Sequence, residues 1–199
     1  MNFVSTDLSK SVEVKHLKLK HPFTCLIAGP TGSGKTQLIR KILKSYNDSI
    51  YNLDKPVIKV FWAYGQWQPL LNFFISDNVI VKHFDGIPSE NLIVEFKPDI
   101  IIFDDLLTEF EKEKNKKIEN MFIKKSHHMN ISVVFAVQNL FYKSIRTISL
   151  NSKYIILLKN PRDSTQILSL AKQIYPSNPK ILTESYYDAT KKILWIFIN

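Results

Sequence analysis

The residues best suited to chemistry form a glycine-rich turn near the start of the chain. Residues 29–36 read Gly-Pro-Thr-Gly-Ser-Gly-Lys-Thr, which has the spacing G-x-x-x-x-G-K-[ST]. Glycines lack a Cβ, so the backbone can take positive φ and direct successive N–H groups at an anion. In such a phosphate-binding loop (P-loop), Lys35 is expected to reach the β and γ phosphates of ATP, and the Thr36 hydroxyl to ligate Mg²⁺. The expected nucleotide-binding residues are Gly29, Pro30, Thr31, Gly32, Ser33, Gly34, Lys35 and Thr36.

A second candidate segment ends in two carboxylates. Residues 99–105 read Asp-Ile-Ile-Ile-Phe-Asp-Asp, and the four consecutive apolar residues predict a strand buried on both faces. Ligands collect at the carboxyl ends of parallel strands, so Asp104 and Asp105 are expected to face the same crevice as Lys35 and Thr36. The pattern is typical of a Walker B segment, in which Asp104 holds Mg²⁺ and Asp105 orients or deprotonates the attacking water. The alternative is a pair of aspartates that cap a turn or a helix.

A third candidate is an amide at the end of another apolar run. Residues 131–137 (Ile-Ser-Val-Val-Phe-Ala-Val) predict a strand, and Gln138 follows it directly. At that point the amide can contact the γ-phosphate of a bound nucleotide or its attacking water, so Gln138 is a candidate sensor. The alternative is a strand-end amide that only satisfies the backbone of the next loop.

The elements that position these residues alternate along the chain. Further strands are predicted at 57–63, 78–84, 154–159 and 192–198, and helices at 35–46, 70–75, 89–96, 108–128, 163–175 and 178–189. This alternation favours an α/β fold with a mostly parallel central sheet and helices on both faces. The strand at 131–137 is expected between the P-loop strand and the aspartate strand, as in RecA-like P-loop NTPases of the additional-strand type.

Length and composition place the chain among globular domains. It has 199 residues, 45% of them hydrophobic, and is expected to form one P-loop ATPase domain over residues 22–199 behind a basic lead-in at 1–21. No apolar run reaches the roughly 20 residues of a membrane span, and the first residues show no signal-peptide pattern. The single cysteine, Cys25, lies in an apolar run and is expected to be buried. A net charge of +9 is compatible with a polyanionic partner such as nucleic acid.

Five segments together resemble a known family. They are Pro22–Thr24 running into the P-loop, the aromatic turn Tyr64–Pro69, residues 101–107 (Ile-Ile-Phe-Asp-Asp-Leu-Leu), Val137–Phe141 and Arg146–Ser152. In these segments the chain is similar to the DNA-packaging ATPases of the FtsK/HerA superfamily, above all those of Polinton or Maverick elements, adintoviruses and related large DNA viruses. The resemblance covers about residues 22–162. Asp105 departs from it, because many of these relatives carry glutamate there.

The resemblance implies an ATP-hydrolysing motor that assembles as a homo-oligomeric ring at a capsid portal or vertex and drives double-stranded DNA into the particle. Such a motor works inside an infected host cell, at the site of virion assembly. The resemblance implies the site residues already identified from the motifs, which are Lys35, Thr36, Asp104, Asp105 and Gln138. It also implies that Arg146 is an arginine finger inserted into the site of a neighbouring subunit, with Arg162 as the second choice.

Two other functions stay open. A nucleotide or small-molecule kinase also uses a P-loop, but it needs an acceptor pocket and a lid of arginines. The three arginines of this chain, Arg40, Arg146 and Arg162, do not cluster as a lid does. A non-catalytic assembly protein would bind ATP and capsid without turnover. The three functions differ in their product, which is free phosphate, a phosphorylated acceptor or nothing.

Overall fold

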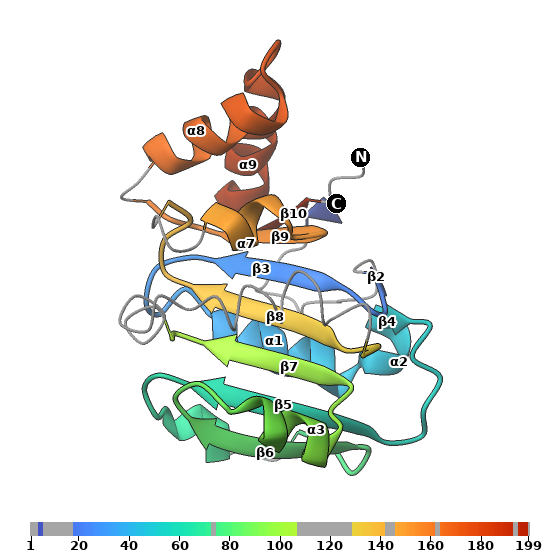
Figure 1. Ribbon diagram of the computed structural model, residues 1–199. Helices are drawn as coiled ribbons and strands as arrows, with labels where there is room; N and C mark the ends of the chain where they lie inside the picture. Colours follow the sequence, from blue (N-terminus) through green and yellow to red (C-terminus); the bar gives the residue numbers. More distant parts are fainter. Residues whose placement is uncertain are drawn as a thin grey trace.

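An eight-stranded sheet forms the centre of the computed structural model (Figure 1). The structure describes residues 4–5, 18–72, 75–106, 129–141, 146–161, 164–192 and 195–198. In order across the sheet, the strands are β1 (Val4–Ser5), β10 (Trp195–Ile198), β9 (Tyr154–Leu158), β3 (Thr24–Ala28), β8 (Ser132–Val137), β7 (Ile100–Asp104), β5 (Ile58–Tyr64) and β6 (Val79–Asp85). The strands from β9 to β6 run parallel, and β10 runs antiparallel to both of its neighbours, β9 and β1. A separate pair joins β2 (Leu19–Lys20) to β4 (Ile50–Tyr51).

The central strands are buried on both faces because their sequences are apolar almost without interruption. Every residue of β3, β7, β8 and β9 is buried, and Cys25 lies among them as expected. β8 lies between β3 and β7, and Phe135 pairs with Leu26 on one side and Phe103 on the other. This confirms the additional strand between the P-loop strand and the aspartate strand. Since the strands are parallel, their carboxyl ends meet at one edge of the sheet.

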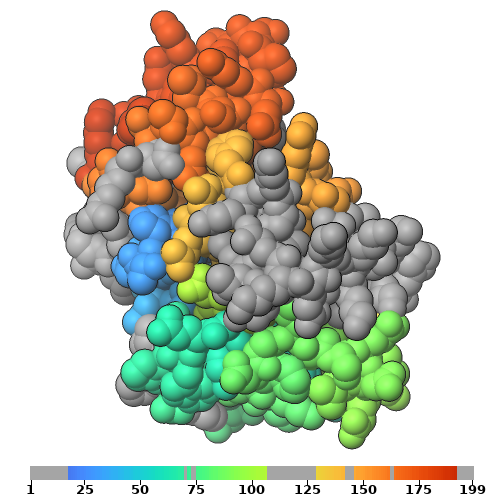
Figure 2. All heavy atoms as spheres, turned by 60° about the vertical axis from the view of Figure 1, so that its left-hand side comes forward, coloured from blue at the N-terminus to red at the C-terminus, as the bar shows by residue number. Residues whose placement is uncertain are grey.

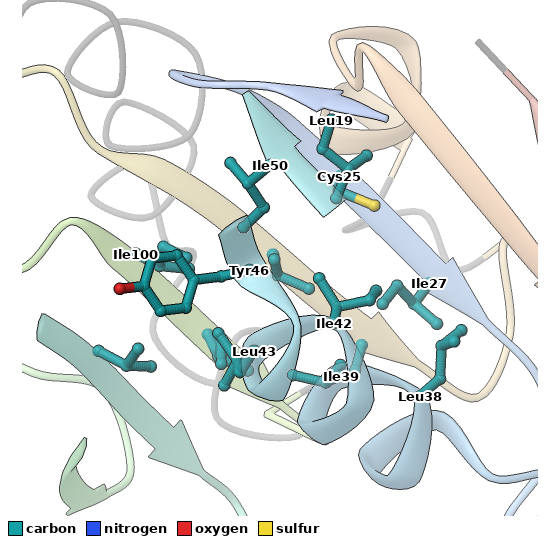
Figure 3. Close-up of a cluster of buried hydrophobic side chains, with 14 of the residues drawn as sticks. Leu19, Cys25, Ile27, Leu38, Ile39, Ile42, Leu43, Tyr46, Ile50 and Ile100 are labelled. Carbon is teal, nitrogen blue, oxygen red and sulfur yellow. The ribbon is translucent and has the colours of Figure 1, made fainter. Parts of the chain in front are cut away.

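One face of the sheet is covered by α1 (Lys35–Lys44) (Figure 1). Leu38, Ile39 and Ile42 recur at helical spacing and are buried against a cluster that includes Ile27 of β3 (Figure 3). The helix ends two residues earlier than predicted. At Ser45 the backbone leaves the helical conformation (φ −111°, ψ 36°), and the Lys41 carbonyl accepts from both its N–H at 3.1 Å and its hydroxyl at 2.9 Å. A short second helix, α2 (Tyr46–Ser49), follows it.

Helices from later in the chain cover the opposite face. They are α3 (Glu90–Phe96), α7 (Arg146–Leu150), α8 (Ser164–Ile174) and α9 (Lys180–Lys192). One buried residue from each belongs to the same hydrophobic core: Ile93, Ile148, Ile167 and Leu182. Successive strand side chains point to opposite faces, so in β7 Ile102 packs on the α1 side and Phe103 on this side. The expected layers of helix, parallel sheet and helix are confirmed.

Several predicted boundaries are wrong. Lys192 ends α9 instead of opening the last strand, because Leu182, Tyr186 and Ala189 keep a buried helical stripe up to that point. The short helix expected at 70–75 is a 3₁₀ turn at Pro69–Asn72. The helix expected at 108–128 lies outside the described residues. Within the described part of the chain, no helix combines the length and the apolar composition needed to cross a membrane.

His21 is a buried imidazole at the amino end of β3. Its Nδ1 lies 2.7 Å from the Ser132 hydroxyl, which also accepts a hydrogen bond from the Phe23 N–H at 3.1 Å. Burial lowers the pKa of His21 below its ordinary value of 6.5, and the nearby Asp99 carboxylate offsets this only in part. Asp99 is itself paired with Lys55. The imidazole is therefore neutral in the folded protein at neutral pH.

The free energy of unfolding is expected to fall as the pH drops below about 6.5, because the unfolded chain then binds a proton that folded His21 resists. This stabilisation is present above the ordinary imidazole pKa and is lost as the pH falls through the lower pKa of the folded state. Urea unfolding at a series of pH values measures it. His21→Asn is expected to reduce the pH dependence, and His83→Asn, at a less buried histidine, to reduce it less. Identical pH profiles for wild type and His21→Asn would contradict the assignment.

Candidate functional site

The P-loop joins β3 to α1 at the carboxyl edge of the sheet, the side turned forward in Figure 2. It starts against β8, because the Gly29 N–H donates to the Val137 carbonyl at 3.1 Å. Gly32 and Gly34 have φ angles of 77° and 93°, which residues with a side chain rarely adopt. Gly34 is the last residue before α1, so the unpaired N–H groups and the positive end of the helix dipole lie at the loop. The loop can therefore bind an anion.

Only glycine fits at position 29, because the backbone there lies close to the side chains of Leu158 and Ser33. A Cβ at this position would lie 2.7 Å from Leu158 Cβ and 2.7 Å from Ser33 Oγ, too close for real contacts. The Ser33 hydroxyl is buried and has no hydrogen-bond partner among the described residues. Gly29 and Ser33 thus pack closely against each other on the sheet side of the loop.

Lys35 is buried beneath the loop. Its Nζ donates to the carbonyls of Gly29 at 2.6 Å and Pro30 at 3.0 Å. Burial lowers the pKa of Lys35, and the carboxylates of Asp105 and Asp104 oppose this shift. The ammonium group is thus held between the loop and the aspartates by weak acceptors. Phosphate oxygens are stronger acceptors and can replace those carbonyls.

Thr36, in the first turn of α1, connects the P-loop to the neighbouring strands. Its hydroxyl lies 3.1 Å from Asp104 Oδ2 at the end of β7. It also lies 3.4 Å from the side-chain oxygen of Gln68, in the segment that follows β5. Three oxygens from three different elements therefore meet at one point.

Asp104 is a buried carboxyl, only 3% exposed. Burial raises its pKa, while the Thr36 hydroxyl, the Trp62 indole N–H and the Lys35 ammonium oppose the rise. The Trp62 N–H is buried and makes no hydrogen bond of good geometry within the described residues, so its influence on Asp104 is that of a nearby dipole. A carboxylate held this way, with little water around it, is poised to bind a cation.

Asp105 is the first residue beyond β7 and has a left-handed φ of 55°. Aspartate tolerates this conformation better than most residues. Its N–H donates to the Ala136 carbonyl at 3.2 Å, and its two carboxylate oxygens accept from Gln138 Nε2 at 2.9 and 3.0 Å. The Nε2 group of Gln138 thus contacts the Asp105 carboxylate.

These elements enclose an open cleft of about 450 Å³. In Figure 2 the P-loop region (blue) lies directly above the segment that follows β5 (teal). The lining residues are Thr31, Gly32, Gly34, Lys35, Thr36, Gln37, Gln66, Trp67, Gln68, Pro69, Asp104 and Asp105. The predicted convergence of Lys35, Thr36 and the two aspartates on one crevice is confirmed.

Other predicted residues lie elsewhere. Gln138 reaches the cleft only through Asp105, and Arg146 is exposed at the start of α7, away from the cleft lining. Arg162 lies outside the described residues. The segment at 66–69 was predicted only as a turn, although its Gln68 contacts Thr36. Its polar side chains after an apolar strand were the signal that could have assigned it to the site.

The fold has known counterparts among solved structures. The genome packaging NTPase B204 from Sulfolobus turreted icosahedral virus 2 in complex with AMP is similar over 89% of this chain and 92% of its own, with a TM-score of 0.56 and 12% sequence identity. The DNA-packaging ATPase B204 from Sulfolobus turreted icosahedral virus is similar over 88% of this chain and 97% of its own, with a TM-score of 0.55 and 14% identity. The AMPPCP complex of the former protein gives a TM-score of 0.53 at 12% identity, over 80% of this chain and 86% of its own.

Sequence comparison adds nothing to this likeness. No protein-family model matches the chain, and no curated protein matches it at a significant level. At 12% to 14% identity the likeness establishes the fold, which is that of P-loop NTPases with a mostly parallel sheet between helices.

Proposed function

We propose that the protein is a Mg²⁺-dependent ATPase that drives double-stranded DNA into a viral capsid. The observation that carries the proposal is the meeting of Lys35 and Thr36 with Asp104 and Asp105 at one cleft. The likeness in fold to two viral genome-packaging NTPases supports the packaging role. The net charge of +9 suits a DNA partner.

The P-loop binds the triphosphate of ATP in this proposal. Its N–H groups and the amino end of α1 surround the phosphate oxygens. Lys35 gives up the carbonyls of Gly29 and Pro30 and donates to the β and γ phosphates instead. Because Lys35 is buried, its charge acts at low dielectric, where attraction to phosphate is strong.

Thr36 and Asp104 fit a magnesium ion. Their oxygens lie 3.1 Å apart, and neighbouring ligands of an octahedral Mg²⁺ are separated by roughly 3 Å. Both are hard oxygen donors, as this ion prefers, and no cluster of three or more His, Cys, Asp or Glu side chains among the described residues offers another cation site. When bound, the magnesium ion neutralises charge on the β and γ phosphates and stabilises the charge that develops during hydrolysis.

Asp105 activates the attacking water in this proposal. Its carboxylate borders the cleft beside Lys35 and is held by the Gln138 amide at 2.9 and 3.0 Å. A carboxylate held in one orientation can accept the water proton without reorganising. In this proposal Gln138 reports the γ-phosphate to β8, because any change at Asp105 alters the hydrogen bonds between the two side chains.

Assembly completes the site in this proposal. The protein forms a ring at the portal or vertex of a capsid, within an infected cell, and Arg146 reaches the cleft of the neighbouring subunit. Its side chain is exposed and is not among the residues that line the cleft of its own subunit, which suits a role in trans. A finger supplied in trans stabilises transition-state charge only when subunits are docked, which couples hydrolysis to assembly.

ATPase assays with and without linear duplex DNA test the proposal. We expect the wild type to release free phosphate slowly, at a rate that rises severalfold with duplex DNA and with protein concentration. Asp104→Ala is expected to abolish this release. Phosphate appearing on an acceptor would indicate a kinase instead. Turnover that ignores both DNA and protein concentration would contradict a DNA-translocating ring.

A further inference from the structure

The segment after β5 is fixed against the aspartate strand. Tyr64 of β5 pairs with Asp104 of β7, and the Gly65 N–H donates to the Asp104 carbonyl at 3.0 Å. Three residues further, the Gln68 carbonyl accepts from the Leu71 N–H at 2.9 Å and opens the 3₁₀ turn. The backbone on both sides of Gln68 is therefore held, so its side chain enters the cleft from a defined position.

The Thr36 hydroxyl has two possible acceptors but can donate fully to only one of them. The hydroxyl carries a single hydrogen, yet two acceptor oxygens lie within its reach, Asp104 Oδ2 at 3.1 Å and Gln68 Oε1 at 3.4 Å. The shorter contact to a carboxylate is the stronger one. Gln68 Oε1 therefore points at the same place as the two oxygens that fit a cation, without a full hydrogen bond of its own there.

We propose that the side-chain oxygen of Gln68 is a third protein oxygen of the magnesium site, bound to the ion directly or through one of its water molecules. The inference rests on the proposed ATPase function and adds a residue that neither the P-loop nor the aspartate pair supplies. Carbonyl oxygen from an amide is an accepted ligand for such hard cations. Gln68 would also connect the ion to the segment that follows β5, so that this segment, α1 and β7 all contribute to its binding.

Gln66 provides a matched control. It has the same side chain, lies two residues away in the same segment and lines the same cleft. The Gln66 side chain has no such contact with Thr36, whereas Gln68 Oε1 lies 3.4 Å from the Thr36 hydroxyl. Changing either glutamine to glutamate adds one negative charge to the cleft, so the two variants differ in distance from the cation and not in net charge.

Mn²⁺ binding to the protein with saturating ADP, followed by electron paramagnetic resonance, tests the inference apart from turnover. Mn²⁺ prefers the same oxygen ligands as Mg²⁺. We expect Gln68→Ala to weaken Mn²⁺ binding about tenfold, as loss of a ligand or its hydrogen-bonded support does. We expect Gln68→Glu to tighten it about tenfold, because ligand charge raises affinity, and Gln66→Glu to change it by less than about threefold.

Two results would overturn the inference. One is unchanged Mn²⁺ affinity in Gln68→Ala, which would leave Gln68 as a partner of Thr36 only. The other is an equal gain in Gln68→Glu and Gln66→Glu, which would reduce the effect to general charge. ADP affinity without metal checks that each variant is folded. If the wild type bound neither ADP nor Mn²⁺ with ADP, the proposed function itself would fail. If the wild type turned over ATP normally and one of the two overturning results were found, only the role of Gln68 in the magnesium site would be rejected.

Discussion

Replacing Lys35 by methionine is expected to lower ATP turnover by at least about a thousandfold, the scale of losing one aligned charge at a reacting phosphate. The reason is geometric. Lys35 sits between the loop carbonyls and the two aspartates, and it is the one cation among the described residues that line the cleft. Methionine keeps an apolar side chain of similar length at this buried position, so the loop keeps its packing while the charge is lost.

Phosphate release under single-turnover conditions measures this effect, and ADP-induced thermal stabilisation measures binding. Lys44→Met is the control, because Lys44 lies exposed in the last turn of the same helix. Without ligand, we expect Lys35→Met to unfold near the wild-type temperature, because burial disfavours the charged form of the Lys35 side chain that the variant lacks. Substantial turnover in Lys35→Met would contradict the placement of the triphosphate at this loop.

The parts of the site that follow from local sequence were predictable. The glycines at 32 and 34 require positive φ, and this requirement is visible in the residue types alone. The apolar runs before Gly29, Asp104 and Gln138 specify parallel buried strands, and parallel strands bring their ends together. From these facts the meeting of Lys35 with the aspartates could be predicted without any contact being known.

The contacts between side chains were not predictable in the same way. Gln138 contacts Asp105 across 33 residues, and Gln68 contacts Thr36 across 32. Each pairing depends on strand register and on the exact exit of a loop, which no local pattern encodes. The end of α1 likewise lies at one residue, Ser45, whose backbone conformation breaks a stretch whose periodicity favoured a longer helix.

The described lining of the cleft carries one cation and two carboxylates. Among the described residues that line it, Lys35 faces two carboxylates, Asp104 and Asp105, which leaves a net charge of −1 before any nucleotide binds. ATP adds further negative charge, and the magnesium ion offsets only part of it. In the proposed ATPase, a further cation would stabilise the charge that develops on the γ phosphate, and the resemblance to packaging ATPases directs attention to Arg146.

Arg146→Ala is expected to lower ATP turnover by about a thousandfold, the lower range for loss of an arginine finger, while ADP binding stays near wild type. Binding is spared because Arg146 lies outside the cleft of its own subunit. Steady-state phosphate release and ADP titration measure the two quantities. Arg162→Ala is the comparison, since Arg162 is the second candidate. Loss of turnover in Arg162→Ala with normal turnover in Arg146→Ala would transfer the role to Arg162.

Mixing inactive variants decides whether the arginine acts between subunits. In an equal mixture of Arg146→Ala and Lys35→Met, a site works when the first variant supplies Lys35 and its neighbour supplies Arg146. Random assembly of a ring with head-to-tail interfaces gives such a pair at about a quarter of the sites. Turnover is therefore expected to recover to at most about a quarter of wild type, from two proteins that are each inactive. If Arg146 acted within its own subunit, no ratio of the two variants would restore activity.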